Sequence, residues 1–176
     1  MTPQTIYHRI RMDLLERMPY SEVIHIGSTA IEGLKTKGDL DINLRVTQDK
    51  FWESVNEIIK MGYFELDGTL QCDSLRHLKP INKYEIDVAI QVTVIGSEHD
   101  TFVIFNEILR FNNYARKEYE VIKTQYGFIP DDDYREKKAI VINKYLNFFK
   151  QSPQQGASPD PSSPASNCIL REYKNQ

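Results

Sequence analysis

Polar and apolar side chains alternate strictly over residues 39–46, in the run Asp-Leu-Asp-Ile-Asn-Leu-Arg-Val. Successive side chains of a β-strand point to opposite faces, so this run predicts a strand with one buried face and one polar face. Residues 84–94 form a second long run that predicts another strand. Two such strands indicate a central sheet whose apolar face is covered by other elements.

Helices and further strands are expected around these two runs. Residues 2–18 predict a helix, because Thr2 suits the N-cap, Pro3 suits the first helical position and apolar residues recur at helical spacing. Similar patterns predict helices at 49–61, 102–111, 114–126 and 133–149, and shorter strands at 22–26, 63–66 and 75–78. This order predicts an α+β (α/β) domain with a mixed central sheet flanked by helices.

Composition supports a single folded domain followed by a tail. The chain has 176 residues, of which 40% are hydrophobic and 27% charged, which suits one hydrophobic core rather than two ordinary domains. From residue 151 onward, proline, serine and glutamine replace the residues that a core needs. We therefore expect a domain at 1–150 and a flexible Pro/Ser/Gln-rich tail at 151–176.

Several classes of protein are not expected. No segment has the roughly 20 apolar residues that cross a bilayer, and the N-terminus lacks the pattern of a signal peptide. Cys72 and Cys168 lie far apart, which argues against a disulfide framework or a zinc site and favours a cytoplasmic protein. The net charge of −3 argues against a broad nucleic-acid-binding surface.

Three aspartates are the candidate catalytic residues. Asp39 and Asp41 are two positions apart on a predicted strand, so their carboxylates point to the same face. Two carboxylates this close are unfavourable unless a cation lies between them. Asp87 belongs to the second long strand, and pairing of the strands would bring it beside the other two. Three convergent carboxylates would suit Mg²⁺ or Mn²⁺ and the phosphoryl or nucleotidyl transfer that these ions support.

A phosphate-binding turn is expected between the first strand and the acids. Gly27 and Ser28 lie where the strand at 22–26 ends and a short helix or turn at 28–35 begins, so backbone and hydroxyl groups there would meet a phosphate. Lys37 would neutralise a triphosphate. Each feature alone also has an ordinary explanation, as a common turn, a solvated strand edge or an exposed loop lysine. Their order and spacing favour the functional interpretation.

The predicted helices at 102–111 and 114–126 carry basic and aromatic side chains together. Arg110 and Lys123 are candidates for contacts with the phosphates or the base of a nucleotide. The alternative, which the helical spacing favours, is an amphipathic helix pair with half-buried tyrosines.

The chain resembles the GrpB family in two segments. Residues 25–42, HIGSTAIEGLKTKGDLDI, are similar to its signature H-x-G-S-T-[AS]-V-x-G-L-x-x-K-x-x-x-D. Residues 105–123, FNEILRFNNYARKEYEVIK, are similar to its helical segment F-R-x-x-L-R…A-x-x-Y-x-x-L-K. That family is grouped with the polymerase-beta-like nucleotidyltransferases, so the resemblance implies their fold.

The activity implied is a metal-dependent nucleotidyltransferase that moves an NMP from an NTP, with ATP as the first candidate, to an acceptor hydroxyl. Asp39 and Asp41 would hold two Mg²⁺ or Mn²⁺ ions, and Asp87 would hold one ion and act as general base. Gly27 and Ser28 would cradle the outgoing phosphates. The acceptor would be a small molecule, or else a protein or RNA. The alternative is a nucleotide- or ligand-binding module that keeps the fold without turnover.

Overall fold

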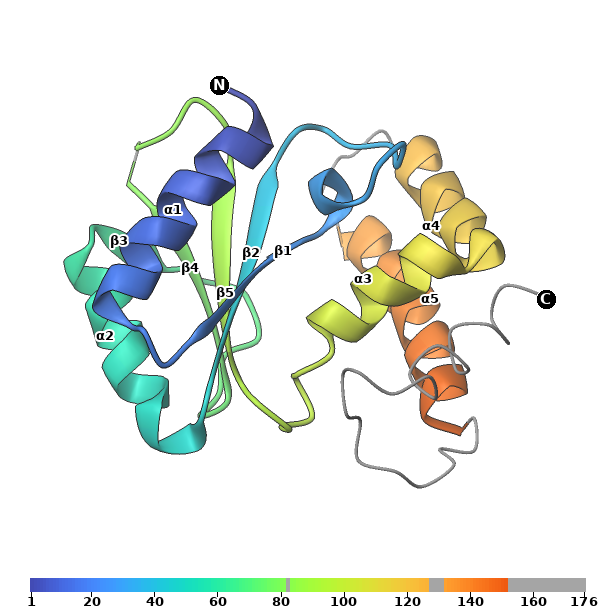
Figure 1. Ribbon diagram of the computed structural model, residues 1–176. Helices are drawn as coiled ribbons and strands as arrows, with labels where there is room; N and C mark the ends of the chain where they lie inside the picture. The colour runs from blue at the N-terminus through green and yellow to red at the C-terminus, as the bar shows by residue number, and fades with distance from the viewer. Residues whose placement is uncertain (82, 127–131, 152–176) are drawn as a thin grey trace, which may run out of the picture. The chain divides into compact units, whose positions relative to one another are not determined.

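The computed structural model describes residues 1–81, 83–126 and 132–151 (Figure 1). Its helices and strands follow one another as α1 (Pro3–Arg17), β1 (Glu22–Ile26), the short 3₁₀ helix η1 (Ser28–Ala30), β2 (Leu40–Val46), a second 3₁₀ turn η2 (Gln48–Lys50), α2 (Phe51–Lys60), β3 (Tyr63–Glu65), β4 (Leu75–Pro80), β5 (Val88–Val94), α3 (Phe102–Phe111), α4 (Asn113–Gln125) and α5 (Asp132–Gln151). Of the tail expected at 151–176, Gln151 is the last residue of α5, and residues 152–176 lie outside the described residues.

Five strands form one mixed sheet in the order β1-β2-β5-β4-β3. β2 and β5 are parallel, and the other neighbouring pairs are antiparallel. The predicted α+β class and mixed sheet are therefore confirmed. The parallel pair matters most for function, because the amino-terminal ends of β2 and β5 meet at the same edge of the sheet.

The alternating pattern of residues 39–46 separates the core from the polar face, as predicted. Leu40, Ile42, Leu44 and Val46 are each 0% exposed. They belong to a hydrophobic cluster that also contains apolar residues of α1 and α2. Both helices cover the same face of the sheet (Figure 1). The polar side chains of β2 therefore belong to the opposite face.

The predicted start of α1 is confirmed. Thr2 is the N-cap, and its side chain accepts a hydrogen bond from the Thr5 N–H at 3.2 Å. Pro3 opens the helix, where its missing N–H has no consequence. The buried face consists of the residues that recur at helical spacing, Ile6, Tyr7, Ile10 and Leu14.

β5 begins later than the sequence suggested, at Val88 rather than at residue 84. Its neighbours explain the difference. β2 begins at Leu40, directly opposite Val88, and β4 ends at Pro80, which has no N–H to extend a ladder. The residues before Val88 have no strand to pair with on either side. Asp87 therefore precedes the strand instead of lying within it.

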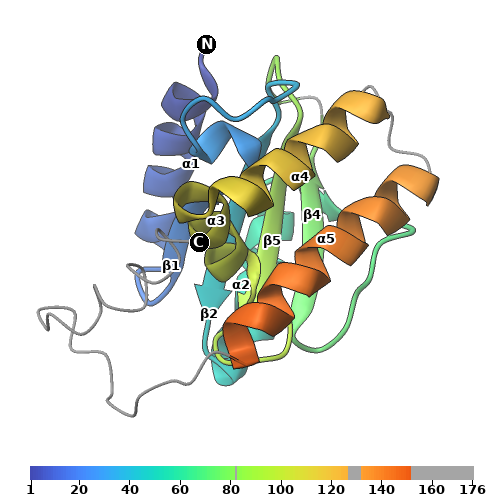
Figure 2. The same cartoon turned by 90° about the vertical axis from the view of Figure 1, so that its right-hand side faces the viewer.

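The chain divides into two compact units, Met1–Asn106 and Glu107–Gln176. The first contains the whole sheet. In the second, α4 and α5 pack side by side (Figure 2). Glu118 of α4 joins them, because it accepts hydrogen bonds from Lys144 at 2.7 Å and from the Tyr145 hydroxyl at 2.8 Å. None of the helices in the described ranges has the length and apolar character that a membrane span requires.

Candidate functional site

The three predicted acids meet at the edge where β2 and β5 begin. Asp41 lies opposite Ala89 in the parallel ladder, and the Leu40 N–H donates to the Asp87 carbonyl at 2.8 Å. Asp39 and Asp87 therefore come directly before the paired strands, at one end of the sheet. All three aspartates line a single pocket of about 210 Å³. Pairing of β2 with β5 therefore brings the three aspartates to one pocket, and their function as a single site stays a prediction.

Two lysines hold two of these carboxylates. The Lys79 ammonium lies 2.8 Å from both carboxylate oxygens of Asp87. The Lys37 ammonium lies 3.4 Å from one oxygen of Asp39. Both lysines line the pocket together with the acids. Neutralisation of a triphosphate by Lys37 stays a prediction, and Lys79 was not singled out by the sequence.

Gln91 adds a polar group that sequence reasoning missed. Its Nε2 donates a long hydrogen bond of 3.4 Å to Asp41 Oδ1. The residue is 7% exposed and lines the pocket, yet its Oε1 has no hydrogen-bond partner in the described part of the chain. The sequence offered one indication of its role, because Gln91 is a polar residue between the apolar residues Ile90 and Val92. A buried carbonyl without a donor is unfavourable, so the pocket contains an unused acceptor beside a carboxylate.

His77 completes the polar lining on β4, directly opposite Gln91. Burial lowers the pKa of His77, and the nearby His99 lowers it further. The imidazole is therefore uncharged at neutral pH and adds no positive charge to the pocket.

Gly27 has a structural role that the sequence did not indicate. Its backbone has φ +75° and ψ −169°, a region that is essentially restricted to glycine. A Cβ at this position would lie only 2.5 Å from Asp41 Oδ2. The close approach that this glycine allows here is therefore that of the Asp41 carboxylate. Its N–H donates to Asn106 Oδ1 at 2.9 Å, and Ser28 is buried. Phosphate binding by Gly27 and Ser28 stays a prediction.

The threonine that follows this turn fixes the backbone at Asp39. The Thr29 hydroxyl donates to the Asp39 carbonyl at 2.8 Å. His25 Nε2 lies 3.0 Å from the same hydroxyl oxygen, and the Tyr7 ring stacks on the imidazole at 4.9 Å. The imidazole thus contacts the same hydroxyl group that holds the Asp39 carbonyl. His25 therefore supports the acidic strand.

The donor set fits a hard divalent cation in its chemistry. Carboxylate and amide oxygens are the ligands that Mg²⁺ and Mn²⁺ prefer, and two ammonium groups already stand beside Asp39 and Asp87 as counter-ions. As they lie, no three acidic, histidine or cysteine side chains within the described ranges are gathered closely enough to hold an ion. Metal binding at Asp39, Asp41 and Asp87 accordingly stays a prediction, and it requires the lysine contacts to open.

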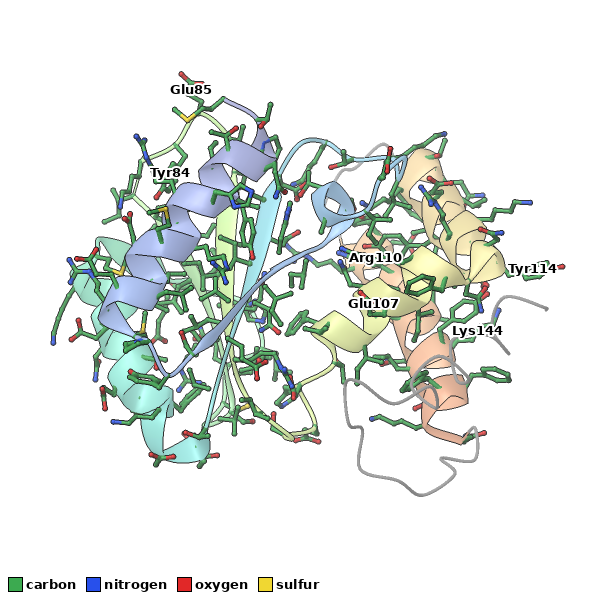
Figure 3. All side chains as sticks on the ribbon, viewed as in Figure 1. Tyr84, Glu85, Glu107, Arg110, Tyr114 and Lys144 are labelled. Carbon is green, nitrogen blue, oxygen red and sulfur yellow. The ribbon has the colours of Figure 1, made fainter. Side chains whose placement is uncertain are left out.

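Glu85, an acid two residues before Asp87, lies outside this pocket. Figure 3 shows it with Tyr84 at the tip of the segment between β4 and β5. Its carboxylate is highly exposed and lies 3.5 Å from the amino group of Met1. Nothing in this position brings it toward the aspartates.

Arg110 and Lys123 belong to the second unit. Arg110 lies on α3, where its Nε lies 3.7 Å from Oε1 of Glu107 (Figure 3). Lys123 is only 6% exposed, and its ammonium lies 5.1 Å from the centre of the Tyr119 ring. Tyr119 is itself buried, as an amphipathic helix pair requires. Nucleotide binding by Arg110 and Lys123 stays a prediction.

Comparison with known proteins agrees with the two segments of family resemblance. A family model described as GrpB protein matches residues 4–147. A UPF0157 protein of Vibrio cholerae is 30% identical over 143 residues, which cover 81% of this chain and 75% of that protein.

The fold is similar to that of a solved structure of the same family. The crystal structure of the conserved protein GrpB from Enterococcus faecalis is 20% identical, has a TM-score of 0.60, and is matched over 94% of its chain and 82% of this one. A crystal structure of the Cid1 poly(U) polymerase bound to MgATP is more distant, with 13% identity and a TM-score of 0.46 over 70% of this chain and 41% of that one. The protein described here belongs to the GrpB family.

Proposed function

We propose that this protein is a metal-dependent nucleotidyltransferase that transfers an NMP from an NTP, with ATP as the first candidate, to an acceptor hydroxyl. The observation that supports it most is the pocket at the start of β2 and β5, where three aspartates from two neighbouring strands lie with two lysines. Such a pocket suits a polyphosphate with its cations, because it offers hard oxygen ligands and ammonium groups side by side.

The acids have distinct roles in this proposal. Asp39 and Asp41 hold two Mg²⁺ or Mn²⁺ ions, and Asp87 holds one. Ions held by these carboxylates would supply positive charge to the phosphates and to the leaving pyrophosphate. The Asp87 carboxylate accepts the proton of the acceptor hydroxyl while that oxygen bonds to the α-phosphorus and the bond to pyrophosphate breaks. Lys37, and the turn at Gly27 and Ser28, face the outgoing phosphates.

A melting experiment tests the metal site. Mg²⁺ or Mn²⁺ should raise the melting temperature of the parent protein, since a ligand stabilises the state that binds it. Asp41→Asn should remove most of that rise. Glu85→Gln is the matched control, because Glu85 is an exposed acid outside the pocket and should leave the response intact. An Asp41→Asn protein that responds to metal as the parent does would refute the metal site.

Kinetics with an identified acceptor would separate the roles of the acids. Asp41→Asn should weaken both nucleotide binding and turnover. Asp87→Asn should keep most of the binding and lower the rate by roughly 10²–10⁴-fold, the usual contribution of a positioned general base. Equal losses of binding in both variants would contradict the separate roles.

One observation favours a second candidate, a nucleotide-binding module without turnover. Two of the three carboxylates are already neutralised by Lys37 and Lys79, and the acids of the described chain are not gathered as metal ligands. Calorimetry with ATP, GTP, CTP and UTP in the presence of Mg²⁺, followed by a search for a nucleotidylated product, distinguishes the two. Metal-dependent binding without any product would favour the module.

A further inference from the structure

Lys79 lies at the centre of the candidate site. It follows Leu78, which pairs with Ile90, so Lys79 comes next to Ala89 in the antiparallel ladder of β4 and β5. Ala89 in turn lies opposite Asp41. The lysine and the aspartate thus belong to one row across three strands, separated only by the small side chain of an alanine. Both line the pocket.

Lys79 contacts both carboxylate oxygens of Asp87, and both side chains are partly exposed to solvent. The ammonium lies 2.8 Å from each carboxylate oxygen, and the two side chains are 28% and 51% exposed. An ammonium in this position competes directly with any metal ion that uses the Asp87 oxygens. Because the pair is in contact with solvent, separating the two charges is not prohibitive.

A second observation is an unsatisfied acceptor in a residue of the pocket lining. Gln91 Oε1 is buried in the pocket lining and has no hydrogen-bond partner within the described chain. The same amide donates to Asp41, which leaves its carbonyl oxygen as an acceptor beside a carboxylate. Two adjacent acceptors suit a positively charged ligand.

We propose that Lys79 exchanges Asp87 for the phosphates of the bound nucleotide. Without ligand, its ammonium neutralises Asp87. When a metal–nucleotide complex enters, Asp87 turns to the metal and Lys79 contacts phosphate oxygens. This inference rests on the proposed function and adds a phosphate-binding residue and a cause of coupling between the two ligands.

Charge explains why metal and nucleotide should bind together. Three carboxylates and two ammonium groups line the pocket. The carboxylates repel a free triphosphate, and the contacts of Lys37 and Lys79 with Asp39 and Asp87 weaken the attraction for a free metal ion. When both ligands bind, the carboxylates contact the metal, and Lys37 and Lys79 contact phosphate oxygens instead of Asp39 and Asp87. Each ligand therefore raises the affinity for the other.

The decisive variant is Lys79→Met, which keeps an unbranched side chain and removes its charge. Two titrations of the full chain are required: Mn²⁺ alone, and the non-hydrolysable analogue α,β-methylene-ATP at saturating Mn²⁺. The variant should bind Mn²⁺ alone more tightly, because the competing ammonium is gone. It should bind the analogue roughly tenfold or more weakly, the usual effect of losing a hydrogen bond to a charged group.

Two further variants control the measurement. Lys83→Met removes a lysine whose ammonium lies 5.7 Å from the centres of the Tyr63 and Tyr84 rings and which does not line the pocket. It should leave both affinities at the parent values. Lys79→Arg keeps the positive charge and should preserve weak binding of Mn²⁺ alone. It also keeps the test decisive if the methionine variant folds poorly.

The outcomes separate this inference from the function on which it rests. Opposite shifts of the two affinities in Lys79→Met support the exchange. Parent-like affinities, or shifts in the same direction, overturn it while Mn²⁺ binding that depends on Asp41 still supports the metal site. Failure of the parent to bind Mn²⁺ overturns the exchange and the proposed function together.

Discussion

Gly27→Ala should be among the most damaging single-methyl substitutions in this protein. The residue has φ +75° and ψ −169°, a conformation that costs a non-glycine residue about 1–3 kcal/mol. The new Cβ would also lie 2.5 Å from Asp41 Oδ2 and 3.1 Å from its Cγ. Relieving such overpacking costs about 1–3 kcal/mol more. We therefore expect a loss of about 2–6 kcal/mol of unfolding free energy.

Gly68→Ala isolates the backbone contribution. Gly68 has φ +73°, and a Cβ there would meet no heavy atom within 4 Å. This variant should lose only about 1–2 kcal/mol, the cost of a left-handed backbone. The excess loss in Gly27→Ala measures the contact with Asp41. Urea unfolding followed by circular dichroism gives both values from midpoints and slopes.

A double-mutant cycle completes this test. In an Asp41→Ala background the colliding carboxylate is absent, so Gly27→Ala should cost only its backbone contribution of about 1–3 kcal/mol. If Gly27→Ala is no worse than Gly68→Ala in the parent protein, or if its excess cost survives in the Asp41→Ala background, the close approach of Asp41 is not what requires the glycine.

Three other substitutions test the supports of the site. Asp100→Asn should lower stability at neutral pH, because Asp100 accepts two hydrogen bonds of 2.7 Å from Arg45. Burial alone would raise the pKa of Asp100, but the hydrogen bonds from Arg45 and a backbone N–H outweigh it and hold the pKa below its usual value. The advantage of the parent over the variant should therefore be complete above about pH 4 and disappear as pH falls through the lowered pKa, in urea unfolding measured across pH. Thr29→Val should cost about 1–2 kcal/mol in the same assay, since the Asp39 carbonyl loses its donor. Ile42→Ala should cost about 2–5 kcal/mol, because Ile42 is 0% exposed in the core.

Local patterns predicted most elements of this fold. The strand at 22–26 and the helix at 102–111 have the predicted bounds, because each is a short run with its own start and end signals. The start of β5 was wrong by four residues, since it depends on where β2 and β4 run out. Pairing partners lie far away in sequence, and single-strand periodicity contains no information about them.

In the candidate site, too, local patterns predicted some features, and contacts between residues distant in sequence determined the others. Alternation placed Asp39 and Asp41 on one face, and the end of the strand at 22–26 marked Gly27 as a turn where a phosphate would approach the backbone. It did not indicate that the approaching group is the Asp41 carboxylate itself. The buried acceptor of Gln91 was also beyond prediction, because an unsatisfied atom is defined by all its neighbours and not by its own residue type.

The relative direction of β2 and β5 is the further feature that determines which residues line this pocket. Parallel pairing of β2 and β5 places Asp39 and Asp87 at the same edge, whereas antiparallel pairing would have put Asp87 at the far end of the sheet. A parallel pair needs a crossover, and here α2, β3 and β4 provide it. Because β4 then runs antiparallel to β5, its last residues return to the edge where β5 begins. The same topology that gathers the acids therefore also delivers Lys79 to Asp87, which explains why a pocket rich in carboxylates contains its own counter-ion.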